Sequence, residues 1–376
     1  MDNAKWDRLF VEITAWAPEL FENLSRTAQD PRWHGEGDVL THTRMVCKAL
    51  TEMDAFRALP EPEKRMLYLA AVLHDVGKHA VTRLDAGEIH APGHGRVGSE
   101  IARRLLWQQG FCGSGEAAQF REGICTLIRY HGLPLHAVED PDGKRRLLQM
   151  AAQGEVAKGV TVRLLCLLAR ADILGRISHD RQELTEKVES CELIAREMGC
   201  FHGPYLFPDA HTGRSFLKGR NIQPEYPLYD DTWGTVVLMS GLPGTGKDTW
   251  IRENLPDLPV VSLDDIRRET GISPLEDQGK VAQIARERAR QLLREKRPFV
   301  WNATNITPQT RGKLVSLFED YGAAVRIVYV ETTASEQKRR NAGRPEAVPE
   351  AAVVRMLEKL TPPEQYEASY VNWIYT

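Results

Sequence analysis

The sequence feature that most constrains the fold is a glycine-rich loop that begins at Gly241 and ends at Lys247. It follows an apolar, strand-like run at residues 236–239 and precedes a helical stretch. Glycines let backbone N–H groups turn inward around phosphate oxygens, while the N-terminus of the following helix adds positive potential. Lys247 can reach the terminal phosphates of a nucleotide. The pattern therefore predicts a strand, a phosphate-binding loop and a helix in direct succession.

Short β-rich runs alternate with helical stretches in this part of the chain. Two further helices are expected to start at Thr307-Pro308 and Val348-Pro349, because proline fits the first helical turn. The alternation predicts an α/β domain with a parallel sheet covered by helices. Its strands are expected at residues 236–239, 259–263, 299–301 and 325–330.

The first half of the chain has helical periodicity up to about Cys200, with apolar residues three and four positions apart, as at 62–74 and 162–173. We expect an all-α helical bundle there. Residues 201–233 are rich in Pro, Gly, Tyr and Asp, which favours a linker. Because 376 residues exceed what one hydrophobic core usually serves, the chain is expected to form several domains. The predicted division is 1–200, a linker at 201–233, and 234–376.

Composition excludes several classes of protein. Hydrophobic residues make up 42% and charged residues 27%, and no apolar run approaches the roughly twenty residues of a membrane span. No secretory signal is apparent, so we expect a cytoplasmic protein without a membrane partner. The six cysteines show no CxxC pairing, which favours reduced core thiols. The net charge of −3 means that any contact with nucleic acid must come from a local basic cluster.

The predicted phosphate site has one unusual position. The residue after Lys247 is Asp248, where a Ser or Thr usually ligates Mg²⁺, and a carboxylate can hold the metal directly or through water. We expect ATP, or another nucleoside triphosphate, to bind here with Mg²⁺. The expected nucleotide-binding residues are Gly241, Pro243, Gly244, Thr245, Gly246, Lys247, Asp248, Thr249, Arg340 and Arg344.

Two further clusters suggest phosphoryl transfer. Asp264 and Asp265 follow the next expected strand, at the sheet edge where ligands of such folds bind. An aspartate there can accept a proton from an attacking hydroxyl, although helix N-capping is an alternative role. The basic run at residues 338–344 supplies guanidinium groups that can neutralise a transferring phosphoryl group. Such a run is, taken alone, more often a solvated helix face.

Residues 234–376 together resemble the phage-type 5′-OH polynucleotide kinases. The resemblance is carried by the loop at 241–250, by Asp264 to Arg267, and by the arginine-rich stretch before Ala347-Val348-Pro349. It implies that Asp264 is the general base and that Arg267 holds the phosphate next to the acceptor hydroxyl. It also implies that Arg340 and Arg344 clamp the donor phosphates. Thr304 and Asn305 stand where relatives carry an acceptor-site motif, whose acidic member is absent or displaced here.

The N-terminal half carries a different set of chemical residues, since all eleven histidines precede Gly241. An adjacent His-Asp pair on a helix, with a His and an Asp from other helices, makes a mixed nitrogen and oxygen site for a divalent metal ion. Two more histidines are enough for a second ion, and two ions can ionise a bridging water that attacks phosphorus. Lys78 is expected to contact the scissile phosphate. The predicted ligands are His42, His74, Asp75, His94, His131 and Asp172.

This arrangement resembles the HD phosphohydrolases, and residues 38–176 are similar to the HD domains appended to CCA-adding enzymes. Those relatives act on 2′,3′-cyclic phosphates and 2′-phosphates. The order of the two modules resembles the HD-Pnk family of bifunctional end-healing enzymes. The resemblance implies RNA or DNA ends as substrates, ATP with Mg²⁺, and one or two divalent ions of Mn, Co, Ni, Fe or Zn in the first module. The healed ends would suit a nucleic-acid ligase.

Two other functions remain open from the sequence. One is a kinase for a nucleoside or small metabolite beside a nucleotide phosphohydrolase, since both domain types support such functions. The other is a nucleotide-sensing regulator that binds ligands without catalysis. Lys78, Asp264 and Arg344 argue against the regulator, because binding alone needs neither a base nor a phosphoryl clamp.

Overall fold

A computed structural model describes residues 3–272, 278–344 and 346–376. The chain divides into two compact units, residues 1–111 with 116–206, and residues 112–115 with 207–376. The change of unit after Leu206 falls inside the segment 201–233 that was predicted as a linker, and this segment contains the helix α12 (Ala210–Leu217). The limits 1–200 and 234–376 stay predictions.

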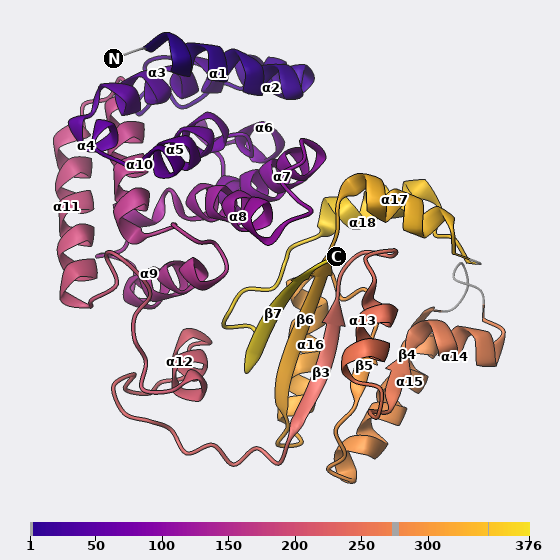
Figure 1. Ribbon diagram of the computed structural model, residues 1–376. Coiled ribbons are helices and arrows are strands. Elements are labelled where there is room, and N and C mark those ends of the chain that lie inside the picture. Colours follow the sequence, from indigo (N-terminus) through magenta and orange to yellow (C-terminus); the bar gives the residue numbers. More distant parts are fainter. Residues whose placement is uncertain (1–2, 273–277, 345) are drawn as a thin grey trace. The chain divides into compact units, whose positions relative to one another are not determined.

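The first unit is helical, as the sequence predicts (Figure 1). The runs expected at 62–74 and 162–173 are the helices α5 and α10. The described helices of this unit are α1 (Asn3–Trp16), α2 (Pro18–Arg26), α3 (Val39–Glu52), α4 (Asp54–Arg57), α5 (Glu61–Leu73), α6 (Lys78–Val81), α7 (His94–Gln108), α8 (Gly115–Tyr130), η1 (Leu133–Leu135), α9 (Gly143–Ala152), η2 (Gln153–Glu155), α10 (Val162–Leu174) and α11 (Arg181–Glu197).

One small sheet interrupts the helices. Strands β1 (Arg83–Asp85) and β2 (Glu88–His90) pair antiparallel. The two residues between them, Ala86 and Gly87, both have positive φ, at 49° and 85°, as a tight two-residue hairpin turn requires. The expectation of an entirely α-helical first half therefore missed this hairpin, whose six strand residues are too few to show a periodicity.

Helices α5 and α10 form the centre of the first unit. Every residue of α5 from Met66 to Leu73 is buried, and so are nearly all residues of α10. A helix that is apolar on all sides is stable only where other helices surround it. The loop after α5 also approaches α7 closely, since a Cβ atom on Gly77 would collide with the carbonyl oxygen of His94. Close packing there places the N-terminus of α7 beside the end of α5.

The second unit has a five-stranded sheet in the order β4-β5-β3-β6-β7, and every pairing is parallel. Four strands match the predicted runs, and Thr307 and Pro349 are the N-caps of α16 and α18. The C-terminal strand β7 was not predicted. The strands are β3 (Thr235–Ser240), β4 (Val260–Ser262), β5 (Val300–Asn302), β6 (Ala324–Glu331) and β7 (Tyr370–Tyr375). The helices are α12, α13 (Lys247–Asn254), α14 (Leu263–Thr270), α15 (Gln278–Arg294), α16 (Pro308–Glu319), α17 (Ala334–Ala342) and α18 (Glu350–Lys359).

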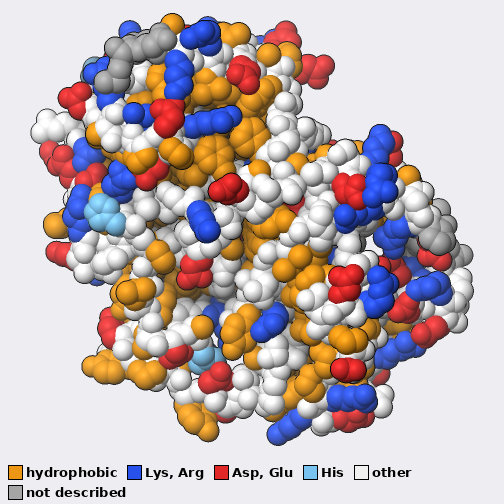
Figure 2. All heavy atoms as spheres, viewed as in Figure 1, with side chains coloured by type: hydrophobic (Ala, Val, Ile, Leu, Met, Phe, Trp, Pro, Cys, Tyr) orange, Lys and Arg blue, Asp and Glu red, His pale blue; other side chains and the backbone are white. Residues whose placement is uncertain are grey.

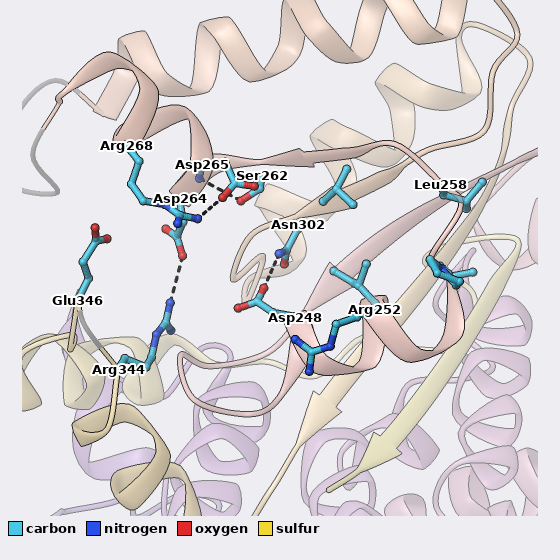
Figure 3. Close-up of a pocket in the computed structure, with 14 residues that line it drawn as sticks. Asp248, Arg252, Leu258, Ser262, Asp264, Asp265, Arg268, Asn302, Arg344 and Glu346 are labelled. Atoms are coloured by element: carbon cyan, nitrogen blue, oxygen red, sulfur yellow. Dashed lines mark hydrogen bonds and ion pairs between the residues drawn. The ribbon is translucent and has the colours of Figure 1, made fainter.

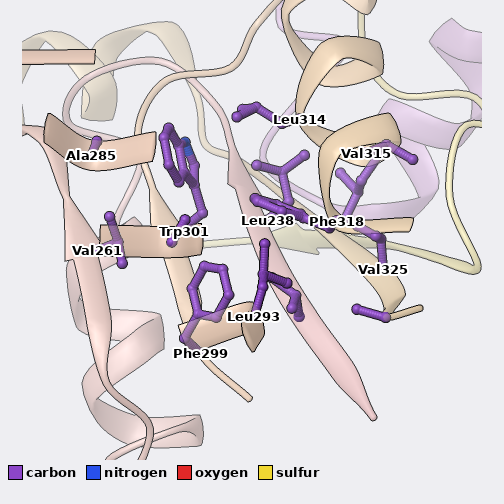
Figure 4. Close-up of a cluster of buried hydrophobic side chains, with 14 of the residues drawn as sticks. Leu238, Val261, Ala285, Leu293, Phe299, Trp301, Leu314, Val315, Phe318 and Val325 are labelled. Atoms are coloured by element: carbon purple, nitrogen blue, oxygen red, sulfur yellow. The ribbon is translucent and has the colours of Figure 1, made fainter. Parts of the chain in front are cut away.

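The central strand β3 contributes to a core on each face of the sheet, because successive side chains of a strand point to opposite faces. Val236 and Leu238 join a cluster with Phe318 and other side chains of α15 and α16 (Figure 4). Val237 and Met239 join a second cluster, which includes Ile251 of α13. The phosphate loop therefore begins at the end of a strand that is held from both sides.

Charge is mixed over the face of the molecule that Figure 2 shows. On the face that Figure 2 shows, Lys and Arg side chains lie interspersed with Asp and Glu side chains, in keeping with the net charge of −3. None of the described helices has both the length and the apolar character that a membrane crossing requires.

Candidate active sites

Asp75 lies at the centre of the candidate metal site in the first unit. It directly follows His74, the C-cap residue of α5. Its Oδ2 atom lies 3.3 Å from Nε2 of His74 and 3.7 Å from Nε2 of His42. Its Oδ1 atom lies 3.4 Å from Nε2 of His94 and 3.8 Å from Nε2 of His131. One carboxylate thus faces two pairs of histidines, one pair through each oxygen.

Asp172 of α10 completes the first pair. Its Oδ1 atom lies 2.9 Å from Nε2 of His42 and 4.0 Å from Nε2 of His74. The structure therefore brings together all six residues that the sequence predicted as metal ligands of this half. They come from α3, the end of α5, α7, the end of α8 and α10, and all but the half-buried His94 are buried.

Three of the histidines are oriented by the backbone. The Nδ1 atom lies 2.8 Å from the Ala71 carbonyl oxygen in His74, and 2.7 Å from the carbonyl oxygens of Ala91 and Ile128 in His94 and His131. Donation of the Nδ1 hydrogen to a carbonyl leaves the Nε2 lone pair directed at Asp75. Such outer contacts fix the tautomer that a metal ligand needs.

The donor set fits divalent metal ions. Both ring nitrogens of His42, Nε2 of His74 and both carboxylate oxygens of Asp75 are buried and make no hydrogen bond of ordinary geometry among the described residues. Buried polar atoms in native proteins are nearly always satisfied, so these atoms are suited to an ion. Two groups of candidate ligands meet at Asp75, one with His42 and His74 and the other with His94 and His131. The arrangement has the ligands for two ions that share one carboxylate.

The charges of the site favour the metal-binding forms of most ligands. Burial alone would raise the pKa of Asp75, but His74 and Lys78 hold it well below its ordinary value. Burial would likewise raise the pKa of Asp172, and Arg176 and His42 hold it well below. Burial lowers the pKa of His131 to about 3. The carboxylates are thus ionised and His131 is neutral at pH 7.

Two cations reach the metal site. Nζ of Lys78, the predicted phosphate contact, lies 2.7 Å from Oδ2 of Asp75 and donates to Oε1 of Gln29 over 2.7 Å. Arg176 was not predicted and pairs with Asp172, with NH2 2.5 Å from Oδ2. Arg176 follows Gly175, the C-cap residue of α10, so it lies just beyond the helix that carries Asp172.

A further carboxylate was also missed. Oε1 of Glu36 lies 2.8 Å from Nδ1 of His42 and forms a hydrogen bond of 2.9 Å with Nδ1 of His34. Its Oε2 accepts from the backbone N–H of Ile177. Burial alone would lower the pKa of His42, but Asp172 and Glu36 raise it above its ordinary value. Glu36 lies outside any helix, where no periodic pattern could reveal the direction of its side chain.

The phosphate loop in the second unit has the conformation that its glycines permit. Gly241, Gly244 and Gly246 have φ of 139°, 82° and 94°, a region that other residues rarely adopt. A Cβ atom on Gly241 would also collide with the carbonyl oxygen of Val330. Nζ of Lys247 donates to the carbonyl oxygens of Gly241 and Leu242 over 2.9 and 2.8 Å. Burial lowers the pKa of Lys247 to about 8.

Neighbouring side chains hold the same loop from outside. Oγ1 of Thr245 donates to the Leu242 carbonyl oxygen, and Nε2 of Gln337 donates to that of Pro243 over 2.7 Å. Arg340 of α17 donates through NH1 to Oγ1 of Thr376, which donates to the Thr245 carbonyl oxygen. The structure thus places Arg340 beside the loop. Thr249 is the third residue of α13. Its Oγ1 accepts a long hydrogen bond of 3.4 Å from NH2 of Arg252.

A cavity of about 710 Å³ opens beside the phosphate loop (Figure 3). Asp248, Asp264 and Arg344, all predicted site residues, line it. The other lining residues were not predicted as site residues, and they include both polar and apolar side chains. The full lining is Asp248, Ile251, Arg252, Leu255, Pro256, Leu258, Val260, Ser262, Asp264, Asp265, Arg268, Asn302, Arg344 and Glu346.

Asp264 lies between two arginines. Its Oδ1 atom is 2.5 Å from NH1 of Arg267. Its Oδ2 atom is 3.3 Å from NH2 of Arg344 (Figure 3). The cap of α14 is Ser262, whose Oγ accepts from the backbone N–H of Asp265. Helix capping therefore does not explain Asp264, and its carboxylate is available in the cavity.

Thr304 and Asn305 have structural contacts. The Thr304 carbonyl oxygen accepts from the Gly241 N–H over 2.8 Å. Asn305 is buried with φ of 43°, and its Nδ2 donates to the Met239 carbonyl oxygen over 2.7 Å. Neither residue is among those that line the cavity. Asn302, at the end of β5, lines it instead and was not predicted.

Two family models match the chain. Residues 39–176 match the model described as HD domain, and residues 236–363 match the model described as AAA domain. The first match contains the six clustered ligands, and the second contains the phosphate loop, Asp264 and Arg344. The chain therefore joins an HD phosphohydrolase domain to a P-loop domain of kinase-like type.

Proposed function

We propose that this chain heals broken ends of RNA or DNA. The P-loop domain phosphorylates a 5′-hydroxyl end with ATP and Mg²⁺. The HD domain opens a 2′,3′-cyclic phosphate and removes the resulting 2′- or 3′-phosphate. Cleavage of RNA by many ribonucleases leaves both of these ends, and a nucleic-acid ligase joins neither. The two activities together yield ends that a ligase can use.

The kinase half of the proposal rests on Asp264. A carboxylate in the cavity beside the phosphate loop can accept the proton of an attacking hydroxyl. Arg344 contacts Asp264 from the arginine-rich segment and can turn to the transferring phosphoryl group, whose charge it would neutralise. Arg267 pairs with the other oxygen of Asp264, outside the cavity lining, and in this proposal it binds the acceptor phosphate.

The cavity favours a polynucleotide acceptor over a free nucleoside. Arg252, Arg268 and Arg344 all line it, together with the apolar side chains of Leu255 and Leu258. Contacts with backbone phosphates supply much of the affinity of proteins for nucleic acids. A free nucleoside carries no phosphate for these arginines to bind. A strand end offers both a base for the apolar surface and phosphates for the arginines.

The phosphohydrolase half rests on Asp75 and the groups around it. Divalent ions held by the six ligands would ionise water and polarise a phosphoryl oxygen. Lys78 and Arg176 lie at the same site and can bind the remaining phosphate oxygens. Buried Asp75, whose two carboxylate oxygens each face a pair of histidines, is the single observation that carries this half.

The test uses an RNA with a 5′-hydroxyl and a 2′,3′-cyclic phosphate, incubated with ATP and a panel of Mn, Co, Ni, Fe and Zn salts. Both ends are then analysed. We expect Asp75→Ala to abolish change at the 3′ end and leave 5′ phosphorylation intact. Asp264→Ala should do the reverse. Asp85→Ala and Asp231→Ala, which remove exposed carboxylates from the two units, are the matched controls.

Three results would contradict the proposal. Phosphorylation of free nucleosides but not of 5′-hydroxyl oligonucleotides would make the P-loop domain a nucleoside kinase. Loss of both activities from either substitution would show that the sites are not independent. A chain that turns over neither ATP nor phosphate esters with any of these metals would be a nucleotide-binding regulator.

A further inference from the structure

Two side chains beside the phosphate loop differ from the residues that usually hold Mg²⁺ in P-loop enzymes. Asp248 follows the loop lysine in the first turn of α13, and Asn302 is the last residue of β5. Nδ2 of Asn302 donates to Oδ1 of Asp248 over 2.7 Å (Figure 3). Both residues line the cavity. The helix and the strand therefore place these two side chains against one another in the cavity beside the phosphate loop.

P-loop enzymes usually hold Mg²⁺ with the Ser or Thr that follows the lysine and with an aspartate from a neighbouring strand. This chain has the carboxylate on the helix and a neutral amide on the strand. We propose that Asp248 and Asn302 form a transposed site for the metal ion of the nucleotide, with the carboxylate supplied by the helix. The proposal rests on the proposed nucleotide-binding role of this domain.

The chemistry of the two side chains fits the ion. Mg²⁺ binds oxygen ligands, and both carboxylate and amide oxygens are suitable. The hydrogen bond uses the amide nitrogen of Asn302 and one oxygen of Asp248. The amide oxygen and the second carboxylate oxygen are therefore the atoms left for a cation. The bond also fixes the orientation of the amide, so that its oxygen cannot exchange places with its nitrogen without losing it.

The transposition has an electrostatic consequence. A Ser or Thr after the lysine is neutral and tolerates ATP without a metal ion. Asp248 instead places a negative charge next to the polyphosphate, on the residue adjacent to Lys247. A metal ion converts this repulsion into attraction because it lies between the two negative groups. The domain should therefore select the metal complex of ATP and reject free ATP.

The experiment measures ATP binding by calorimetry, without any polynucleotide, in Mg²⁺, in Mn²⁺ and in EDTA. Wild-type protein should bind ATP at least about tenfold more tightly with Mg²⁺ than with EDTA. Asp248→Ser should tighten binding in EDTA by about tenfold, and Asp248→Ala, which offers no oxygen ligand, should also lose most of the gain from Mg²⁺. Asp248→Ser combined with Asn302→Asp should restore that gain, because it recreates the usual arrangement.

Two further variants keep the test sharp. Asp248→Asn preserves the size of the side chain and should behave like Asp248→Ser in EDTA, so a packing defect of the serine variant can be recognised. Asp257→Ser removes an exposed carboxylate outside the cavity lining and should leave the ratio of affinities unchanged.

Equal affinity of the wild type for ATP in Mg²⁺ and in EDTA would overturn the inference. Full retention of the Mg²⁺ effect in Asp248→Ala would also overturn it, because the metal would then be held by other groups. The outcome does not depend on the acceptor. A finding that the domain phosphorylates nucleosides instead of polynucleotide ends would refute the proposed function and leave the transposed site intact.

Discussion

Lys247 should make ATP binding depend on pH in a specific way. The side chain is buried, and its ammonium group donates to two backbone carbonyl oxygens of the loop. Burial lowers the pKa from the ordinary 10.5 to about 8, although Asp248 and Asp264 act in the opposite direction. A shift of this size corresponds to about 3 kcal/mol of cost for the charged form in the free protein. The nearby Arg344 adds to the lowering.

The sign follows from comparing the free and bound states. In the free protein Lys247 is about nine-tenths charged at pH 7 and about nine-tenths neutral at pH 9. Bound triphosphate supplies negative charge that raises the pKa and returns the proton. Binding at pH 9 should therefore take up about 0.9 proton, whereas binding at pH 7 should take up about 0.1. The affinity should fall about tenfold between pH 7 and pH 9.

The assay is calorimetric titration with MgATP at both pH values, each in two buffers of different ionisation enthalpy. The difference in heat between buffers gives the number of protons taken up. Lys247→Arg is the control, because a guanidinium stays charged at both pH values and should show no uptake. Uptake below about 0.3 proton at pH 9 in the wild type, or equal uptake in Lys247→Arg, would refute this account of the lysine.

Two other perturbations test the two units separately. Glu36→Gln removes the charge 2.8 Å from Nδ1 of His42 and should weaken metal binding by about tenfold, measured by competition with a chelator; unchanged affinity would mean that Glu36 does not support the ligand. Phe318→Ala removes a fully buried ring from the core of the P-loop domain and should cost about 3–5 kcal/mol of unfolding free energy, measured with denaturant. A cost below about 1 kcal/mol would show that the core is not packed as described.

The sequence predicted those elements whose apolar pattern can be recognised within a single segment of the chain. The runs that became β3 and β6 are buried on both faces, so they show as continuous apolar stretches. The edge strand β7 pairs only with β6 and is partly exposed, and its position depends on a partner some forty residues earlier in the chain. The hairpin of β1 and β2 is defined by its turn and not by its strands. The periodicity of apolar residues within one segment reveals neither a strand that depends on a distant partner nor a short hairpin that depends on its turn.

The candidate sites show a similar division. The clustering of the predicted metal ligands could be anticipated because His74 and Asp75 are adjacent on the chain and their partners lie on or next to other helices of the same bundle. Asn302 and Glu36 could not, because what matters is the direction of a side chain at the end of a strand or in a loop. The acceptor role of Asn305 stays a prediction, and what the structure adds is a positive φ and a hydrogen bond to the Met239 carbonyl oxygen, neither of which a motif could reveal.

The two sites prepare for phosphate chemistry with opposite arrangements of charge. In the HD domain, surrounding cations keep the carboxylates of Asp75 and Asp172 ionised, and burial keeps His131 neutral. These three ligands are therefore already in the forms that bind a metal ion, whereas His42, whose pKa is raised by Asp172 and Glu36, must release a proton to do so. In the P-loop domain, Lys247 is mostly charged at pH 7, but Asp248 places a negative charge beside it, which a metal ion bound with the nucleotide would offset. The first site thus has most of its ligands in their metal-binding forms before an ion binds, whereas the second would gain its cation together with its nucleotide.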